Sequence, residues 1–476
     1  MKSIDHFPEF GRITTVQGYG GARQRAAYLY RPAQPEHIGE IFHQARKEGF
    51  SVGLYGSGRS YGDAPLNSGN ILLDLRRLNR ILDWNPDTGV VRLEPGVTIQ
   101  QLWQHMLEDG WWPSVVPGTM FPTVGGCLAM NVHGKNNYTQ GTFGEHVLEF
   151  SALLPTGAEI TCSPKKNSDL FHALIGGSGL LGVFTSITLQ LKRVYSGDLW
   201  VQAWAAPSLR RMMAEMEELK SQVDYIVGWV DGVARGSAIG RGQLHSADYL
   251  PPGEDAQPYR TLSLGYQNLP DTFFGLVPAS ILWRLMAPWM NNLGVRMVNL
   301  LKYLSSATIG NHKRFRQPHA AFHFLLDYIP NWRMAYGREG LIQYQCFISS
   351  SHAVNAFEEI LRLTHKRGLP SYLGVVKCHR PDVFLLSHAV DGFSLALDFK
   401  VTRGNRVALQ RLTDALDEIV LEAGGRFYLA KDSTLKPEVF RKYLGEETLQ
   451  RFWKLKHRCD PECVLQNDLY RRLFVG

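Results

Sequence analysis

The chain has 476 residues, of which 44% are hydrophobic and 20% charged, and this composition excludes an extended disordered protein. That length allows two or three domains with hydrophobic cores of their own. The formal net charge of +7 is spread along the sequence without a compact Lys/Arg block, so no nucleic-acid partner is expected. The sequence has neither an apolar run of about 18 residues nor a signal-peptide core after Met1, which predicts a cytoplasmic protein without a membrane span. Its six scattered cysteines predict reduced thiols and no metal site.

Short strands and helices alternate through the first 195 residues. Residues 35–48 are predicted to form an amphipathic helix that ends at Gly49, and Thr98 and Gln101 form a capping box for a second helix. The remaining predicted elements are strands at residues 50–55, 71–75, 149–154, 158–162 and 183–191, a hairpin around residues 85–89, and helices at residues 99–108 and 168–175. This mixture predicts two small α+β lobes.

Two glycine-rich loops lie in this region. The first, residues 56–63, reads GSGRSYGD, and the second, within residues 116–144, contains PGTMFPTVGG and HGKN. Glycine lets a backbone turn sharply or approach a ligand closely. The residues around the second loop are small and apolar, which suits burial. Two buried loops of this kind indicate one large, phosphate-bearing cofactor.

A third glycine cluster, residues 177–182, matches the dinucleotide fingerprint G-x-G-x-x-G. A Rossmann site requires a strand, the loop and then a helix. Here a predicted helix precedes the loop and a predicted strand follows it. We therefore reject a Rossmann fold and assign these glycines to the rim of the cofactor site.

Residues 273–304 are rich in apolar and aromatic side chains, among them Phe274 and Leu276. The favoured interpretation is a buried helical pair. The alternative is an amphipathic segment that touches a membrane or a lipid tail, with Arg284, Arg296 and Lys302 at the lipid headgroups.

The last third of the chain predicts one antiparallel sheet backed by helices, which would cover the cofactor. The predicted elements are strands at residues 341–348, 371–377, 393–399 and 426–431 and helices at residues 353–367 and 405–421. The predicted fold class is therefore α+β. The predicted domains are residues 1–195 around the cofactor, residues 196–424 as the cap, and residues 425–476 returning to the first domain.

Six motifs in order, GSGRSYGD, PGTMFPTVGG, HGKN, GTFGEHV, GGSGLLG and AKDS, resemble the vanillyl-alcohol-oxidase superfamily of flavoenzymes. Within it they are most similar to the decaprenylphosphoryl-ribose 2'-oxidase family. The resemblance covers about residues 11–195 closely and about residues 332–473 more loosely. It implies an FAD-binding domain of the p-cresol methylhydroxylase type, in two lobes, with a substrate-binding cap domain.

The resemblance also implies the site residues. Lys431, His133 and Tyr61 would be catalytic, Gln343, Gln345, Lys377 and Lys431 would bind substrate, and no metal is implied. The residues implied to bind the cofactor are Gly56, Ser57, Gly58, Arg59, Ser60, Tyr61, Pro117, Gly118, Thr119, Thr123, Gly125, Gly126, His133, Gly134, Gly179, Gly182, Val183 and Tyr428.

Lys431, in AKDS, is the leading catalytic candidate because a cation beside the flavin stabilises the reduced ring and holds the reacting oxygen. Each assignment has a competing structural interpretation. Lys431 could be a surface lysine paired with Asp432, His133 could be a structural residue, and Gln343 and Gln345 could be polar positions on a sheet surface.

The chain departs from its relatives at two positions. Arg59 occupies the place of a histidine that bonds covalently to the flavin in many superfamily members, which predicts dissociable FAD. Ala396 occupies the place of an active-site cysteine in the best-known members of the family. A thiol at that position therefore has no role in this chain's turnover.

The function implied by the resemblance is oxidation of a sugar hydroxyl on a polyprenyl-phosphate-linked pentose to a 2'-keto sugar. This would be the first half of an epimerisation to arabinose, completed by a separate NAD(P)H-dependent keto-reductase, and peripheral membrane contact would suit the lipid substrate. One alternative is a soluble FAD-dependent alditol or aldonolactone oxidase. The other is a non-catalytic flavin-binding partner in a glycan-assembly complex.

Overall fold

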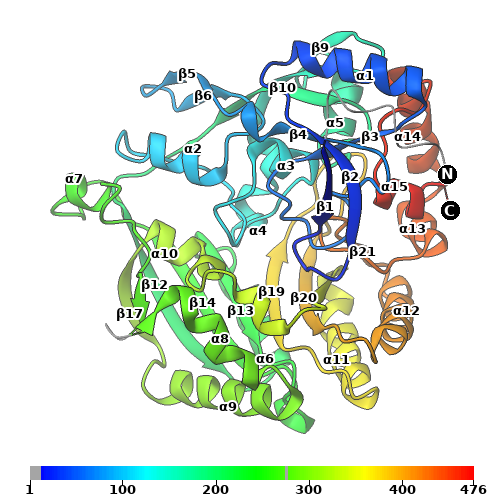
Figure 1. The fold of residues 1–476 in the computed structure, drawn as a ribbon. Helices are drawn as coiled ribbons and strands as arrows, with labels where there is room; N and C mark the ends of the chain where they lie inside the picture. The colour runs from blue at the N-terminus through cyan, green and yellow to red at the C-terminus, as the bar shows by residue number, and fades with distance from the viewer. Residues whose placement is uncertain (1–11, 274–276, 476) are drawn as a thin grey trace.

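The computed structural model describes residues 12–273 and 277–475 and has two α+β lobes above an antiparallel-sheet cap (Figure 1). The lobes fill the upper part of the view and the cap fills the lower part. This architecture confirms the predicted fold class.

The first lobe is a four-stranded sheet with the order β1-β2-β4-β3. Helix α1 (Glu36–Glu48) packs through buried Ile38, Phe42 and Ala45, as predicted, and ends at Gly49, whose φ of 68° favours glycine. The strands are β1 (Arg12–Gln17), β2 (Gln24–Tyr30), β3 (Val52–Tyr55) and β4 (Ile71–Asp74). The first glycine loop leaves the sheet directly from the end of β3.

The second lobe is a five-stranded antiparallel sheet with the order β5-β6-β10-β8-β9. The predicted hairpin joins β5 to β6, and the predicted capping box of Thr98 and Gln101 begins α2. The strands are β5 (Ile81–Asn85), β6 (Val90–Leu93), β8 (Val147–Leu153), β9 (Glu159–Cys162) and β10 (Val183–Gln190), with β7 (Trp111–Trp112) paired to β11 (Lys192–Arg193). The helices are α2 (Ile99–Met106), α3 (Val124–Ala129), α4 (Asn137–Gln140) and α5 (Ser168–Leu174).

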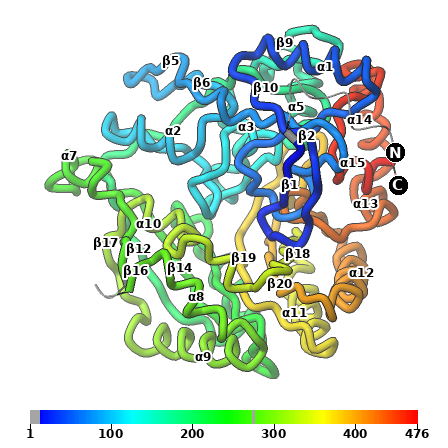
Figure 2. Tube along the Cα trace, in the orientation of Figure 1, coloured from blue at the N-terminus to red at the C-terminus, as the bar shows by residue number. Residues whose placement is uncertain are grey.

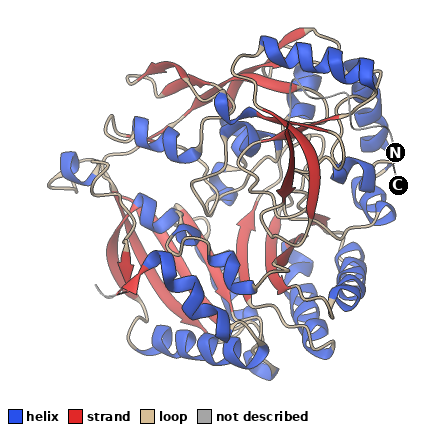
Figure 3. Ribbon diagram, viewed as in Figure 1, coloured by secondary structure: helices blue, strands red, loops and turns tan. Residues whose placement is uncertain are grey.

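The cap is an eight-stranded sheet with the order β17-β12-β14-β13-β19-β20-β18-β21. Figure 3 shows its strands running from between the lobes to helices at the base of the view. The strands are β12 (Asp198–Ala206), β13 (Tyr225–Val230), β14 (Gly242–Tyr249), β17 (Lys313–Pro318), β18 (Leu341–Ser349), β19 (Leu373–His379), β20 (Gly392–Lys400) and β21 (Arg426–Phe427). Helices α6 (Leu209–Leu219), α11 (Ser350–Lys366) and α12 (Arg406–Glu422) bury Met212, Phe357 and Leu416. Gly228 on β13 faces Met212, so Val227 and Trp229, its neighbours along the strand, point to the opposite face.

The C-terminal segment returns to the lobes, where Figure 2 shows it in red beside α1. Val52 of β3 donates its backbone N–H to the carbonyl of Val464 at 2.7 Å. The segment contains α13 (Pro437–Leu444), α14 (Glu446–Cys459) and α15 (Asp468–Leu473). Short β21, at its start, still belongs to the cap sheet, so the predicted strand at residues 426–431 is too long.

The favoured interpretation of residues 273–304 as a buried helical pair is wrong. Helix α9 (Asn292–Thr308) leaves Leu293 78% exposed, and Trp289 beside it is also exposed. Phe274 and Leu276 lie outside the described residues. The other elements here are the hairpin β15 (Thr272–Phe273) and β16 (Val277–Pro278) and helices α7 (Pro258–Thr261), α8 (Leu282–Met286) and α10 (His319–His323). No helix in the described part of the chain has the length and apolar character needed to cross a bilayer.

Candidate active site

A cavity of about 620 Å³ lies between the loops of the two lobes and the open face of the cap sheet. It brings together nearly all of the predicted site residues. The predicted residues that line it are Gly56, Ser57, Gly58, Arg59, Ser60, Tyr61, Pro117, Gly118, Thr119, Thr123, Gly125, Gly126, His133, Gly179, Gln343, Gln345, Lys377, Tyr428 and Lys431.

Three predicted cofactor residues do not line this cavity. The backbone of Gly134 packs against Asn136 and Val116, behind the cavity wall. Gly182 faces Leu154 and Leu174, and Val183 is buried in β10 opposite Leu153. These three positions therefore lie behind the cavity wall. Of the third glycine cluster, Ser178 and Gly179 reach the cavity.

The glycines of the first loop are required by close approaches. A Cβ on Gly56 would stand 2.4 Å from the Thr123 hydroxyl, which caps α3 by accepting a hydrogen bond from Gly126 N–H. Gly58 has a φ of 62°, and a Cβ there would stand 2.3 Å from the Tyr55 hydroxyl. The two glycine-rich loops thus touch each other directly, and both line the cavity.

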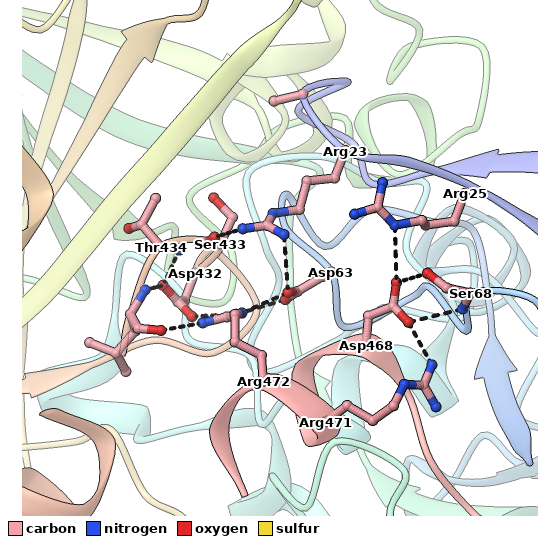
Figure 4. Close-up of polar contacts among 12 residues, drawn as sticks. Arg23, Arg25, Asp63, Ser68, Asp432, Ser433, Thr434, Asp468, Arg471 and Arg472 are labelled. Atoms are coloured by element: carbon pink, nitrogen blue, oxygen red, sulfur yellow. Dashed lines mark hydrogen bonds and ion pairs between the residues drawn. The ribbon is translucent and has the colours of Figure 1, made fainter. Parts of the chain in front are cut away.

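The loop that carries Lys431 is fastened to the first glycine loop (Figure 4). The Arg472 guanidinium donates to both Asp63 oxygens at 2.7 Å and to Asp432 Oδ2 at 2.8 Å. Burial opposes the charge on Asp63, but Arg472 outweighs it and holds the pKa of that carboxyl below its usual range. A Cβ on Gly62 would stand 1.7 Å from the carbonyl oxygen of Asp432, so only glycine fits at this crossing. Two motifs about 370 residues apart in sequence are thereby joined.

Lys431 points into the cavity, and its Nζ lies 3.8 Å from the centre of the Tyr61 ring. The proposed pairing of Lys431 with Asp432 is wrong, because Asp432 pairs with Arg472. The carboxylate close to Lys431 is buried Asp398 on β20, which accepts a hydrogen bond from Gln343. Burial lowers the pKa of Lys431, against the pull of Asp398, and raises the pKa of Asp398. The two pKa values approach each other, which eases movement of a proton at Lys431 Nζ.

His133 is buried in a group of aromatic side chains. Gln345 Nε2 lies 3.0 Å from His133 Nε2 and donates to it, so the proton of the neutral ring sits at Nδ1. Burial, reinforced by nearby cations such as Lys377, lowers the pKa of His133 well below its usual value. His133 Nδ1 has no partner among the described residues. A neutral imidazole with a free N–H is thus available to a ligand.

The structure adds four residues that sequence reasoning missed: Asp398, Ser394, His379 and His388. The Ser394 hydroxyl and His379 Nε2 share a hydrogen bond of 2.8 Å. The centre of the His133 ring lies 4.9 Å from that of the His379 ring and 5.6 Å from that of the His388 ring. Ser394 and Asp398 alternate with Ala396 along β20, so the period of the strand could have placed all three on one face. No local signal marked the two histidines.

Comparisons with known proteins agree with this geometry. The family described as "FAD binding domain" matches residues 26–163, and "D-arabinono-1,4-lactone oxidase" matches residues 348–473. The decaprenylphosphoryl-β-D-ribose oxidase of Mycolicibacterium smegmatis is 30% identical over 474 residues, 96% of this chain and 97% of that protein. The chain belongs to the decaprenylphosphoryl-β-D-ribose oxidase family. An uncharacterised Streptomyces coelicolor protein from the mprA 5' region is 31% identical over 389 residues, 79% of this chain and all of that protein. The D-arabinono-1,4-lactone oxidase of Yarrowia lipolytica is 26% identical over 176 residues, 36% of this chain and 33% of that one.

This member of the decaprenylphosphoryl-β-D-ribose oxidase family is an FAD-dependent oxidoreductase that acts on sugar-like substrates. The alternative of a non-catalytic flavin-binding partner is therefore set aside. The residues present fit FAD. The two glycine-rich loops leave room for the cofactor close to the backbone. In addition, buried Arg59 Nε, Tyr61 Oη and His133 Nδ1 have no hydrogen-bond partner among the described residues, and all three residues line the cavity.

Arg59 stands where many superfamily members carry the flavin-linked histidine. Its guanidinium lies 5.0 Å from the Tyr19 ring centre and 4.8 Å from that of Phe121. A guanidinium forms no covalent link to a flavin, so FAD is predicted to be released intact when the protein is denatured. Retention of flavin by the denatured chain would contradict this.

Proposed function

We propose that this enzyme oxidises a sugar hydroxyl of a polyprenyl-phosphate-linked pentose to a 2'-keto sugar. The observation that carries the proposal is the charge of the cavity. Lys135, Lys302, Lys377 and Lys431 line it, and no Asp or Glu is found among its described lining residues. A cavity walled by cations in this way suits an anionic substrate. The full-length similarity to the Mycolicibacterium oxidase supports a sugar linked to a lipid phosphate.

The chain's own residues suit removal of a hydroxyl proton. FAD, when bound, supplies the hydride acceptor. Lys431 in its neutral form accepts the hydroxyl proton at Nζ, and the nearby Asp398 carboxylate stabilises the ammonium that results. His133 donates from Nδ1 to an oxygen of the sugar, held in place by Gln345. Tyr61 and Tyr428 pack beside these groups and exclude water.

Anaerobic reduction of the bound flavin tests the proposal. Polyprenyl-phosphoryl ribose is expected to bleach the flavin absorbance, whereas free ribose and alditols at the same concentration leave it unchanged. Mass spectrometry of the sugar should then show the loss of two hydrogens, one from C2 and one from the hydroxyl on C2. Bleaching by free sugars with equal efficiency would overturn the assignment of a lipid-linked substrate.

A second candidate is an aldonolactone oxidase, favoured by the match of residues 348–473 to the arabinonolactone oxidase family. This matched region includes Lys377, Asp398 and Lys431, which act on a hydroxyl in either substrate. D-arabinono-1,4-lactone in the same anaerobic experiment separates the two candidates. Reduction by the lactone alone would replace the lipid-linked pentose with a small neutral substrate.

A peripheral membrane contact belongs to the same proposal. Leu293, Met297, Leu301 and Leu304 recur at helical spacing and form one exposed face of α9. Between Asp271 and Asp327 the sequence contains six Lys and Arg residues and no Asp or Glu. An exposed apolar face in a basic segment favours an anionic membrane surface, here that of the cytoplasmic leaflet.

Sedimentation with lipid vesicles tests this contact. Full-length holoenzyme is expected to sediment with vesicles that contain phosphatidylglycerol, and Leu301→Glu should lower the bound fraction several-fold. Leu82→Glu, at an exposed position on the second lobe, is the matched control and should bind as the parent does. Equal binding by all three proteins would contradict the contact.

The proposed product requires a second enzyme. A 2'-keto sugar gains a hydride from the opposite face to become the arabinose epimer, and this chain's chemistry removes hydride. A separate NAD(P)H-dependent keto-reductase would complete the step. Arabinose should therefore accumulate only when such a reductase and NAD(P)H are added to the oxidase reaction.

A further inference from the structure

The cavity extends beyond the proposed sugar site across the face of the cap sheet. Gln345 on β18 lines one end and His245 on β14 lines the other. These strands are separated by β20, β19 and β13, so four spacings of ~4.8 Å place the two positions about 19 Å apart. That length is several times the width of one sugar ring. The far part of the cavity must therefore accommodate something other than the pentose.

A row of lysines follows this extension. Besides burial, the charge of Lys377 lowers the pKa of both Lys431 and Lys135. Besides burial, the charges of Lys135 and Lys302 lower the pKa of His245, to about 3. The row therefore runs from Lys431 at the sugar end through Lys377 and Lys135 to Lys302, with His245 between the last two.

Lys302 lies on the face of α9 that packs against the protein. Val295, Asn299 and Ser306 share its helical face and are buried, while exposed Leu293 and Leu304 lie on the opposite face. Lys302 is itself exposed, so the alternative in which it meets lipid headgroups stays a prediction. Asn299 Nδ2 donates to Asp231 Oδ1 at 3.0 Å and fixes this part of α9 to the sheet.

The Lys302 ammonium reaches the cavity without a carboxylate. Its Nζ lies 4.0 Å from the centre of the Trp229 ring on β13, and no salt bridge among the described residues involves it. Desolvation of the ammonium by the surrounding cavity walls lowers its pKa to about 8. The Lys135 ammonium, across His245, donates to the carbonyl oxygen of Phe322 and lies 4.1 Å from the centre of its ring. It has no salt bridge among the described residues. Two cations thus face one part of the cavity with no anion of the protein between them.

We propose that Lys302 and Lys135 bind the phosphate of the substrate, at the far side of the cavity from Lys431. The substrate's apolar chain then leaves past Met286 and Leu326, which line the cavity near α8, toward the exposed face of α9. This inference rests on the proposed function for its substrate class. If Lys302 binds the phosphate, the enzyme binds a phosphate-linked sugar more tightly than a neutral sugar because of this lysine.

Binding of a phosphodiester to the FAD-loaded full-length enzyme tests the site without turnover. Methyl dodecyl phosphate, below its micelle concentration, is expected to bind in calorimetry, whereas dodecanol and inorganic phosphate bind at least tenfold more weakly. Lys302→Met should weaken methyl dodecyl phosphate about ten- to hundredfold. Lys302→Arg should restore most of the affinity. Flavin absorbance and the thermal midpoint of each variant report whether it has folded.

Arg296→Met is the matched control because Arg296 lies on the same helix and is exposed, as Lys302 is, but does not line the cavity. It is expected to bind methyl dodecyl phosphate as the parent does. Equal loss of affinity in Arg296→Met and Lys302→Met would overturn the site in favour of a general surface charge. Unchanged affinity in a folded Lys302→Met protein would also overturn it.

Turnover separates this inference from the proposed function. With farnesylphosphoryl ribose, Lys302→Met should raise KM about ten- to hundredfold and change kcat little. Suppose that farnesylphosphoryl ribose fails to reduce the flavin of the parent, while Lys302→Met still weakens the binding of methyl dodecyl phosphate. The proposed substrate is then wrong, and the phosphate site is supported. If the parent is reduced and Lys302→Met keeps its KM, the phosphate site falls and the proposed function stands.

Discussion

The flavin end of the cavity and its lysine-lined end are built from different parts of the chain. At the flavin end, backbone meets backbone or a small side chain, as where Gly62 passes the carbonyl of Asp432 and Gly56 passes the Thr123 hydroxyl. At the other end, side chains from separate elements converge, with Trp229 from β13, His245 from β14 and Lys302 from α9. We expect the first end to bind FAD through close fit of shape, and the second to present positive charge to a substrate.

This difference decides which positions tolerate change. A crossing of two backbones has no room for a Cβ, so substitutions at the flavin end should act on folding and on FAD binding together. A lysine that extends into a cavity has room around it. Substitutions at the lysine end should leave the fold intact and change which ligand binds.

The largest effect is expected from Arg472→Met at the flavin end. Removing this guanidinium leaves Asp63 and Asp432 without their shared partner, and losing one member of a buried ion pair costs about 3–5 kcal/mol. Urea unfolding followed by flavin release measures the loss. Arg458→Met, which breaks a half-exposed pair with Asp169, should cost at most about 1 kcal/mol. Equal midpoints for the two variants would contradict the role given to Arg472.

The same network has a pH dependence of known sign. The folded pKa of Asp63 is lowered, so its contribution to stability is present above the unfolded value of about 3.9 and is lost as pH falls through the folded value. Acid release of FAD should therefore begin below about pH 4 in the parent. Arg472→Met should release FAD at higher pH.

Lys431→Met should slow anaerobic flavin reduction about 10²–10³-fold, the usual cost of removing one group that stabilises charge in the transition state. The FAD should stay bound, because the Asp432–Arg472 contact that holds this loop remains. Stopped-flow absorbance measures the rate. Lys454→Met, at an exposed position on α14, is the control and should reduce at the parent rate. An unchanged rate for Lys431→Met would remove the catalytic assignment.

Gly62→Ala and Gly39→Ala compare a position where two backbone segments touch with an open position on a helix. A Cβ at Gly62 would meet the Asp432 carbonyl at 1.7 Å, whereas a Cβ at Gly39 in α1 meets nothing within 4 Å. Gly62→Ala should lose about 1–3 kcal/mol or more and weaken FAD binding. Gly39→Ala should gain about 0.5–1 kcal/mol, because alanine favours the helix. Thermal unfolding of both holoenzymes checks this. Similar midpoints would show that the two loops move apart at Gly62 with little loss of stability.

Features with local requirements could be predicted from the sequence. Gly58 in the first loop and Gly49 after α1 have positive φ, and Thr98 caps α2 through a residue three positions away, so each leaves a signature within a few residues. The alternation of β18 likewise placed Gln343 and Gln345 on one face, which the structure shows to be the face toward the cavity. Such features need no knowledge of distant segments.

The lysine end was not predictable in the same way. Whether the apolar residues of α9 are buried depends on what packs over them, and the periodicity of a helix is the same in either case. At the opposite end of the cavity, Asp398 is likewise close to Lys431 only because the loop of Lys431 returns to β20, after a helix and a turn. A contact of this kind between distant segments has no local signature.

The pH dependence of substrate binding is the finest test of the lysine end. Desolvation lowers the pKa of Lys302 to about 8, and burial with the charge of Lys377 lowers the pKa of Lys135 to about 7, while His245 stays neutral. Both lysines are cationic below their pKa values, so the affinity for methyl dodecyl phosphate should fall as pH rises from 7 to 9. Each lysine that must be protonated contributes up to about tenfold per unit of pH. Above pH 8, Lys302→Met should therefore lose affinity with a slope smaller by about one than the parent. Equal slopes in the two proteins would show that Lys302 does not hold the phosphate.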